Sequence, residues 1–338
     1  HMGTSQVMAQ PSTSGQPMAD LLQSVESDLE RVDAWILDQL STGPEVLKPL
    51  LDYVGRFRGK RLRAAQVLLV GKACGSASEE HIKVAGIIEM IHSATLVHDD
   101  LLDEAKERRK LDCLHVEWGA HTAVLLGDWI YSQAFMASTR MRDQTCSQIL
   151  SEATGKVCAG EMHQNLTRGL FSLSEEDYFS QIDGKTAALF EAGGRLAAHY
   201  SGASSSLCDA AARYGLLAGR AFQVVDDMLD LAGLEAEVGK SLGTDWQRGK
   251  MTLPLIRLRD SLNAQDRNAL QELFQQGTDR EILQQEPFAS ALEEAMTGVH
   301  SEVESMLTES TDLLAMLPEQ GIAGELAKLT HFLGARKF

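Results

Sequence analysis

Two stretches of the sequence are apolar on every side of a predicted helix, and each contains or runs into a group of aspartates. They are 82–98, followed by Asp99, Asp100 and Asp103, and 214–231, which contains Asp226, Asp227 and Asp230. A helix that is apolar all round is buried at the centre of a protein. Carboxylates at the end of such a helix face an interior cleft, where unpaired charge is very costly. The pattern predicts a helical core that carries two acidic clusters.

The rest of the chain also has helical periodicity. Apolar residues recur at spacings of three and four between residues 18 and 42, which is typical of an amphipathic helix. Further helices are predicted at 45–57, 61–74, 79–104, 115–140, 143–168, 174–199, 206–232, 252–262, 265–276, 279–298 and 299–315. Alternating β-type segments bounded by turn dipeptides are absent from the sequence. The predicted fold is all-α, with the two apolar helices at the centre and one-sided helices in an outer layer.

The ends of the chain and one internal loop differ from these helices in composition. Residues 1–17 are rich in Ser, Gln, Thr, Gly and Pro and are predicted to be a disordered tail, in which His1-Met2 resembles a cloning remnant. Between 233 and 251, glycines alternate with Lys240, Arg248 and Lys250, a composition typical of a mobile cationic loop. No other stretch resembles a linker, so 18–338 is expected to form one domain.

Charge and cysteine content exclude several classes of protein. The formal net charge is −17, which argues against a nucleic-acid-binding protein because such proteins need a basic face. Five cysteines without a CxxC pair are expected to be reduced thiols. The sequence has no secretory signal and no run of the ~18–20 apolar residues that a membrane span needs. We therefore expect a soluble, cytoplasmic protein that binds any anionic substrate through local basic residues or cations.

The aspartates of both clusters have the spacing DDxxD. Residues four apart lie on one face of a helix, about 5.4 Å apart along its axis, so Asp99 and Asp103 can bind one cation or bracket two. Facing carboxylates build metal sites in helix bundles, and oxygen-only ligands select hard cations such as Mg²⁺ or Ca²⁺. One DDxxD alone is also typical of a solvated helix end. Its recurrence on a second apolar helix favours a Mg²⁺ site.

Basic residues occur at several points near the predicted acidic clusters. They are Lys60 and Arg63 in GKRLR, Arg108 and Arg109 after the first cluster, Lys185 before Thr186, and Lys240 and Lys250. Each alone is typical of solvated charge, although GKRLR opens a predicted helix and helix N-termini favour anions. Carboxylates for Mg²⁺ and bases for oxygen anions together indicate a diphosphate ligand. His92, nearly two turns before Asp99, suits either a core position or a phosphate contact.

Six motifs follow one another along the chain. They are GKRLR (59–63), HSATLVHDDLLDEAKERR (92–109), GDWIYSQAF (127–135), GKTAALF (184–190), FQVVDDMLD (222–230) and GKSLGTDWQRGKMTLP (239–254). In this order and spacing they resemble trans-isoprenyl diphosphate synthases, in particular the medium- and long-chain, octaprenyl-type enzymes. The likeness covers roughly 20–338 and implies an isoprenoid-synthase-type helical bundle, usually a homodimer. The chain departs from the family's usual residues at Arg58, Ala64 and Lys110.

The resemblance implies a prenyltransferase that condenses isopentenyl diphosphate with an allylic diphosphate, such as farnesyl diphosphate, and releases diphosphate. It assigns direct contacts with two or three Mg²⁺ ions to Asp99, Asp103 and Asp226, assisted by Asp100, Asp227 and Asp230. It assigns isopentenyl diphosphate to Lys60, Arg63, His92 and Arg109, and the allylic diphosphate to Arg108, Lys185, Thr186, Gln223, Lys240 and Lys250. Together with the three metal-contacting aspartates, Lys185 and Lys240 are the expected catalytic residues.

Product length in this family depends on the residue five positions before the first aspartate, where a bulky aromatic gives short products. Here that position is Ala94, followed by Thr95, which implies an open tunnel with Met90 or Phe135 closing it lower down. The expected product is an all-trans chain of more than about 20 carbons, roughly 30–50. Three alternatives remain: a short-chain geranylgeranyl or farnesyl diphosphate synthase, a class I terpene cyclase, and a non-catalytic partner subunit.

Overall fold

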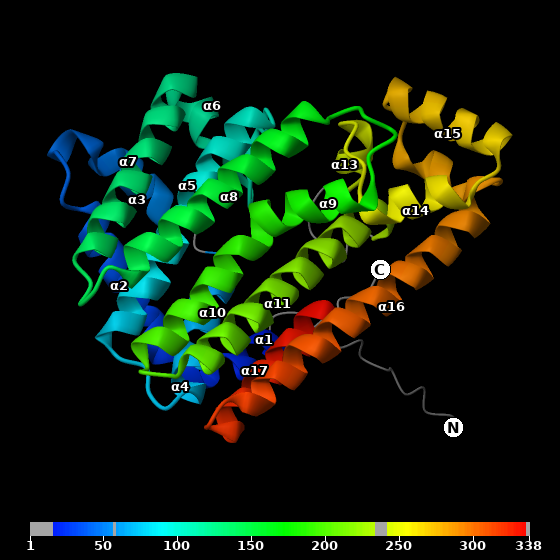
Figure 1. Cartoon of the computed structure of the whole chain (residues 1–338). Coiled ribbons are helices and arrows are strands. Elements are labelled where there is room, and N and C mark those ends of the chain that lie inside the picture. The colour runs from blue at the N-terminus through cyan, green and yellow to red at the C-terminus, as the bar shows by residue number, and fades with distance from the viewer. Residues whose placement is uncertain (1–15, 57–58, 234–241, 336–338) are drawn as a thin grey trace, which may run out of the picture.

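The computed structural model describes residues 16–56, 59–233 and 242–335, and nearly all of its regular elements are helices (Figure 1). The first half contains α1 (Gln16–Leu21), η1 (Gln23–Val25), α2 (Glu26–Leu40), η2 (Glu45–Leu47), α3 (Lys48–Arg56), α4 (Leu62–Ala73), α5 (Glu79–Leu102), β1 (Glu107–Arg108), β2 (Leu111–Asp112), α6 (Leu114–Trp118), α7 (Ala120–Thr139) and α8 (Thr145–Leu166). The tail predicted at 1–17 lies outside the described residues, apart from Gln16 and Pro17, which begin α1.

The second half continues the bundle. It contains α9 (Glu175–Ile182), η3 (Asp183–Ala187), α10 (Ala188–Tyr200), α11 (Ser205–Ala232), α13 (Thr244–Gln247), α14 (Leu253–Ser261), α15 (Ala264–Gln276), η4 (Arg280–Gln284), α16 (Phe288–Leu313), η5 (Leu314–Met316) and α17 (Gln320–Gly334). In Figure 1 the long helices α8, α10, α11 and α16 run in the same general direction across the molecule. The all-α prediction is confirmed.

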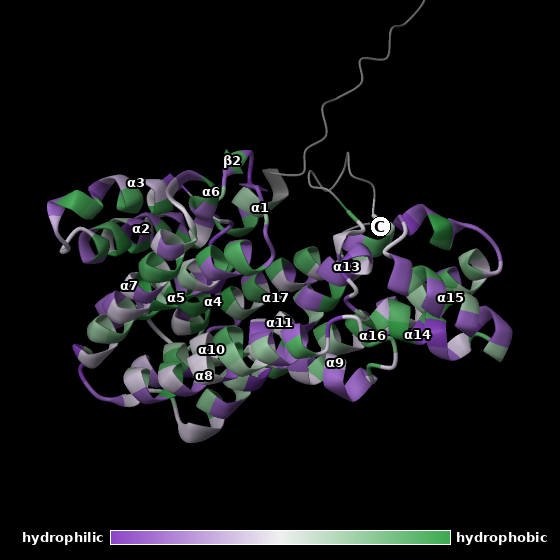
Figure 2. Cartoon of the chain, turned by 90° about the horizontal axis from the view of Figure 1, so that it is seen from above, coloured by the Kyte–Doolittle hydropathy of each residue, from purple (hydrophilic) through white to green (hydrophobic). Residues whose placement is uncertain are grey.

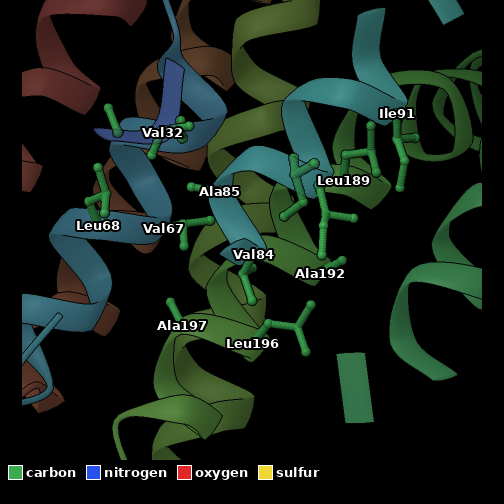
Figure 3. Close-up of a cluster of buried hydrophobic side chains, with 14 of the residues drawn as sticks. Val32, Val67, Leu68, Val84, Ala85, Ile91, Leu189, Ala192, Leu196 and Ala197 are labelled. Carbon is green, nitrogen blue, oxygen red and sulfur yellow. The ribbon is translucent and has the colours of Figure 1, made fainter. Parts of the chain in front are cut away.

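The two helices predicted to be central, α5 and α11, are buried over most of their length. Their fully buried residues include Val84, Ala85, Ile87 and Ile88 of α5 and Val224, Val225 and Met228 of α11. The helix α5 packs against α2, α4, α7 and α10, and Figure 3 shows side chains from α2, α4, α5 and α10 meeting in one cluster. The two apolar stretches therefore identified two of the helices at the core.

The expectation that all other helices have only one buried face is wrong for α4 and α10. Every residue of α4 from Ala64 to Gly71 is buried, because α5, α10 and α17 pack around it. In α10, Gly193 and Gly194 allow close approach, since a Cβ at Gly194 would lie 2.2 Å from the carbonyl oxygen of Ala211. Small residues lower the apolar character of a sequence while permitting complete burial.

The buried side chains form two clusters that share α11. One contains residues of α2, α4, α5, α7, α8, α10 and α17, and the other contains residues of α9, α14, α15 and α16. Tyr214 and Ala218 of α11 belong to the first cluster, whereas Val224 and Met228 belong to the second. In Figure 2, α14 and α15 lie at one end of the molecule and α2 and α3 at the other. The second acidic group on α11 therefore lies on the side of the second cluster.

Several predicted boundaries are wrong. The helix expected over 18–42 is interrupted at Leu22–Val25 by η1, and the helices expected at 279–298 and 299–315 are the single helix α16, preceded by η4. The predicted break fell at Gly298, which continues the helix although it has no side chain. The C-terminal helix α17 was not predicted, although Leu326, Leu329 and Leu333 are buried at helical spacing.

Some properties of the described part of the chain agree with the composition. No helix there is long and apolar enough to cross a membrane. All five cysteines are free thiols, as predicted, and burial raises the pKa of Cys146 to about 12. A short antiparallel hairpin, β1 paired with β2, was not predicted by the sequence.

The β1–β2 hairpin turns through two residues in the left-handed region, Arg109 (φ 51°) and Lys110 (φ 65°). A two-residue turn of this kind favours glycine, because a side chain costs about 1 kcal/mol there. We expect Lys110→Gly to raise the free energy of unfolding by about 0.5–1 kcal/mol, measured by urea denaturation. Lys106→Gly is the control and should not stabilise, because Lys106 lies directly before β1 and has no positive φ. Equal effects at both positions would contradict the turn argument.

Candidate active site

The first acidic cluster lies at the last turn of α5, where its three carboxylates have different partners. Asp100 is almost fully buried and accepts two hydrogen bonds from Arg108, at 2.8 Å from Nε and 2.6 Å from NH2. Asp99 lies 4.0 Å from Nζ of Lys185, and its side chain is 16% exposed. Asp103, the C-terminal cap of α5, is 35% exposed and lies 3.3 Å from NH2 of Arg168. Burial raises the pKa of Asp99 to about 7, against the attraction of Lys185.

The second acidic cluster occupies the C-terminal half of α11. Asp227 is buried and accepts hydrogen bonds from the hydroxyl of Tyr178 at 2.5 Å and from Nε2 of Gln223 at 3.0 Å. Asp230 is also buried and accepts hydrogen bonds from Oγ1 of Thr244 and the backbone N–H of Asp245, both at 3.1 Å. Asp230 therefore fixes the start of the 243–252 loop to α11.

The six aspartates fall into two groups of three. Asp100, Asp227 and Asp230 are buried and hydrogen-bonded within the protein, whereas Asp99, Asp103 and Asp226 keep exposed surface. The second group is the one to which the family resemblance assigns direct metal contact. Within the described residues, no three His, Cys, Asp or Glu side chains already converge as a metal site. The donors are all carboxylate oxygens, which suits Mg²⁺, an ion that takes one or two carboxylates and completes its shell with water and phosphate oxygens.

A single turn of π-helix, η3, connects the two clusters. Lys185 reaches toward Asp99 and lies 2.9 Å from Glu161 of α8. The next residue, Thr186, donates a hydrogen bond of 2.8 Å to Oε1 of Gln223, which in turn bonds Asp227. Single π-turns occur frequently at functional sites. Of these two successive side chains of η3, Lys185 lies beside the first acidic cluster and Thr186 is linked to the second through Gln223.

A cavity of about 100 Å³ lies beside the first cluster. Its lining residues are Asp103, Gln164, Thr167, Arg168, Leu173, Gln181, Lys185, Asp245, Arg248, Lys250 and Met251. Lys250 also lies 3.6 Å from Asp227. Burial alone would lower the pKa of Lys250, but the carboxylates of Asp227 and Asp245 raise it above its ordinary value, so this side chain is a cation. Lys185, Lys250 and Asp103 of the first cluster therefore line one cavity, and the second cluster adjoins it through the contact between Lys250 and Asp227.

A second group of basic residues surrounds His92. Burial, together with the charges of Arg63, Arg108 and Arg109, holds the pKa of His92 well below its usual range. Arg63 lies over the ring of Phe190 at 4.8 Å, and its buried Nε has no hydrogen-bond partner among the described residues. Arg109 packs beside Gly59, where an added Cβ would lie 3.2 Å from its NH2. Cations concentrated around a neutral imidazole favour an anion, which agrees with the predicted isopentenyl diphosphate contacts.

Other predicted residues have less definite positions. Lys60 is exposed, and Lys240 lies outside the described residues. Ala94 has 0% exposed surface, Met90 is also buried, and Thr95 and Phe135 are half-buried. The side chain of Ala94 is fully buried, so the structure does not test the open tunnel expected at this level. The tunnel stays a prediction. Met90 borders a separate, smaller cavity between α2, α3, α5 and α7.

Several residues at the site were not identified from the sequence. They are Glu161 and Gln164 of α8, Arg168 after α8, and Tyr178 of α9. Glu161 and Gln164 are three residues apart and both contact Lys185, at 2.9 and 3.2 Å. That spacing places polar side chains on one helix face and was a usable signal. Tyr178 gave no such signal, because a tyrosine in a short amphipathic helix is usually an ordinary core residue.

We expect Tyr178→Phe to lower the free energy of unfolding by about 1.5–3 kcal/mol, because it removes a buried hydrogen bond to a carboxylate. Tyr214→Phe is the matched comparison, since the Tyr214 hydroxyl is equally buried but pairs at 2.7 Å with the neutral hydroxyl of Thr330. Its loss should be smaller, about 1 kcal/mol. Urea denaturation of both variants measures the difference. Equal losses would show that the charge of Asp227 does not strengthen the bond.

Known proteins share both the sequence and this arrangement of helices. A family model described as polyprenyl synthetase matches residues 44–289. The octaprenyl diphosphate synthase of Haemophilus influenzae is 30% identical over 94% of this chain and 97% of its own length. The octaprenyl diphosphate synthase of Escherichia coli is 31% identical over 90% and 94%.

Solved structures agree with these relatives. A decaprenyl diphosphate synthase from Rhodobacter capsulatus superposes with a TM-score of 0.83 at 28% identity, covering 95% of this chain and 100% of that one. A geranylgeranyl pyrophosphate synthetase from Pyrococcus horikoshii gives 0.86 at 26% identity, with 95% and 100% covered. Both the family model and the relatives span the acidic clusters and the lysines of the cavity. The chain belongs to the polyprenyl synthetase family.

Proposed function

We propose that this protein is a chain-elongating trans-prenyltransferase, which condenses isopentenyl diphosphate with an allylic diphosphate and releases diphosphate. The observation that carries the proposal is the cavity where Asp103, Lys185 and Lys250 meet, with Asp99 and Asp227 directly behind the lysines. The names of the relatives support it, since they are octaprenyl, nonaprenyl and solanesyl diphosphate synthases. Geranylgeranyl diphosphate synthases are also among the relatives, so chain length is a separate question.

Mg²⁺ is the proposed cofactor, bound by Asp99, Asp103 and Asp226. The carboxylate donors and their exposed surface support this assignment. A solved polyprenyl synthase from Caulobacter crescentus, 29% identical with a TM-score of 0.84 over 97% of this chain and 100% of that one, is complexed with calcium and isoprenyl diphosphate. When bound, Mg²⁺ would stabilise negative charge on the departing diphosphate. Asp100, Asp227 and Asp230 would then act through their hydrogen bonds to Arg108, Gln223 and the 243–252 loop.

The basic residues of this chain fall into two groups, one for each diphosphate. Lys185 and Lys250 stabilise the charge that develops as the allylic carbon–oxygen bond breaks. Arg63, His92 and Arg109 hold the second diphosphate, so that the isopentenyl double bond lies beside the allylic carbon and forms the new carbon–carbon bond. The proton lost from the isopentenyl unit goes to the released diphosphate in this scheme, because no side chain is assigned as a base. The positions of the two cationic groups support two separate diphosphate sites.

The product and the assembly are further parts of the proposal. We propose a product longer than about 20 carbons and a homodimer, both on the resemblance described above. The short-chain synthase remains the second candidate, because relatives of both kinds match the chain. Retention of both acidic clusters argues against a non-catalytic partner subunit.

The decisive test is incubation of the full chain with isopentenyl diphosphate, farnesyl diphosphate and Mg²⁺, followed by measurement of released diphosphate and of product length. We expect diphosphate release that stops when EDTA removes the metal and returns when Mg²⁺ is restored. Geranyl and geranylgeranyl diphosphates in parallel reactions identify the preferred primer. Absence of diphosphate release with all three primers would reject the proposed function.

A further inference from the structure

Two Arg-Gly dipeptides from distant parts of the chain meet at the rim of the cavity. Arg168-Gly169 follows α8 and Arg248-Gly249 follows α13, and the backbone N–H of Gly169 donates a 2.7 Å hydrogen bond to the carbonyl of Gly249. Both glycines have positive φ, 81° and 71°. A Cβ at Gly249 would also lie 3.2 Å from the N and Cα of Gly169. We call this pair of dipeptides the Arg-Gly clasp, and its geometry requires glycine on both sides.

The clasp brings two guanidinium groups to one carboxylate. Arg168 lies 3.3 Å and Arg248 3.9 Å from the oxygens of Asp103, the most exposed carboxylate of the first cluster. Both arginine side chains are 42% exposed. Ion pairs as exposed as these contribute little to stability. A contribution to folding therefore does not explain why two loops converge on Asp103.

The charge around the cavity favours an anion. Four of its lining side chains are cationic, and the anionic ones are Asp103 and Asp245. The two lysines also pair with Glu161 and Asp227, which lie outside this lining, so the positive excess belongs to the cavity surface. Binding of a cation by Asp103 would remove its charge from this balance and leave both guanidinium groups without their carboxylate. An oxygen-rich polyanion can bind both the cation held by Asp103 and the two guanidinium groups.

We propose that Arg168 and Arg248 are additional ligands of the allylic diphosphate, an inference that rests on the proposed function. In the absence of substrate they pair with Asp103. When Asp103 binds Mg²⁺ together with the diphosphate, the two guanidinium groups pair with phosphate oxygens instead. The planar guanidinium group suits this exchange because it binds carboxylate and phosphate in the same two-pronged geometry.

The test uses the full chain and Mg²⁺ with inorganic diphosphate as the probe, measured by isothermal titration calorimetry. Arg168→Gln and Arg248→Gln are each expected to weaken diphosphate binding about tenfold, the loss typical of one charge-assisted hydrogen bond. Arg→Lys at either position should restore part of the affinity. Arg213→Gln is the matched control, because Arg213 is 46% exposed and pairs at 3.2 Å with Glu309 away from the cavity. The control should bind like the wild type.

Steady-state kinetics supply the second measurement. In the two glutamine variants, KM for farnesyl diphosphate should rise about tenfold, while KM for isopentenyl diphosphate stays within about twofold. Gly249→Ala should reproduce the loss without removing a charge, because it opens the clasp. Unchanged diphosphate affinity in both arginine variants would overturn the inference. If these variants also needed more Mg²⁺ for activity, the arginines would act only by positioning Asp103.

The two proposals fail in different ways. If the wild-type protein binds Mg²⁺ and diphosphate but condenses no pair of prenyl substrates, the proposed function is wrong. The binding comparison between the arginine variants and Arg213→Gln still decides the inference in that case. If the wild type condenses substrates and the arginine variants bind diphosphate normally, only the inference is wrong.

Discussion

Replacing Asp99 by asparagine is expected to lower kcat by about three orders of magnitude without lowering the stability of the fold. Asp99 is proposed to hold Mg²⁺ against the departing diphosphate, and electrostatic stabilisation of this kind contributes roughly 10²–10³-fold per group or more. An amide of the same shape keeps the packing but loses the charge. The measurement is diphosphate release with saturating substrates and Mg²⁺, together with thermal unfolding of the same preparation.

The stability of Asp99→Asn distinguishes a functional from a structural carboxylate. Burial raises the pKa of Asp99 to about 7, and the nearby carboxylates of Glu161 and Asp103 contribute to the rise, so its charge is unfavourable in the folded state. Tm should therefore stay the same or rise. Asp209→Asn is the control, since Asp209 is exposed and pairs with Arg195 at 2.7 Å. Full activity in Asp99→Asn would remove this residue from the proposed mechanism.

The second large effect is expected on product length, where Thr95→Phe should shorten the main product to about 20 carbons or fewer. Thr95 lies one turn before Asp99, so both side chains are on the same face of α5. It is half-buried, which leaves some space for a larger side chain. A phenylalanine there would stand directly below the allylic diphosphate and block a growing chain. Chromatography of the dephosphorylated products measures the change.

Ala94→Phe should also shorten the product, at a cost in stability. The side chain of Ala94 is fully buried, and overpacking a core position typically costs about 1–3 kcal/mol. Ser93→Phe is the control, because Ser93 borders the smaller cavity between α2, α3, α5 and α7 rather than the face of Asp99. Unchanged chain length in the folded Thr95→Phe and Ala94→Phe variants would remove this part of α5 from length control.

The parts of the fold that could be predicted from the sequence depend on local patterns. Apolar residues all round a helix identified α5 and α11, and the DDxxD spacing identified both acidic clusters. The burial of α4 could not be predicted in this way. Its small residues are accommodated by close contact with α5, α10 and α17, which meet only in the folded molecule.

The same limit applies to the site. Lys185 and Lys250 stand beside glycine in recognisable motifs, so the sequence identified them. Tyr178 and Arg168 lie outside the six motifs, and they reach the site because distant helices bring them to Asp227 and Asp103. The division of the six aspartates into buried and exposed groups also depends on partners far away in the sequence. Spacing shows which carboxylates share a helix face, but not which of them accept hydrogen bonds from other parts of the chain.

The π-turn of η3 has a further consequence for how α10 tolerates change. A π-turn holds one more residue than an α-helical turn, so it shifts the phase of the helix that follows it. Deleting one residue within 183–187 would rotate the preceding side chains by about 100° relative to α10. If Gly193 and Gly194 kept their close contacts with α4 and α11, then Lys185 or Thr186 would lose its contact at the site. The extra residue thus allows the side chains of η3 to face the site while α10 keeps the rotation that its packing requires. A deletion in η3 would preserve only one of these two arrangements.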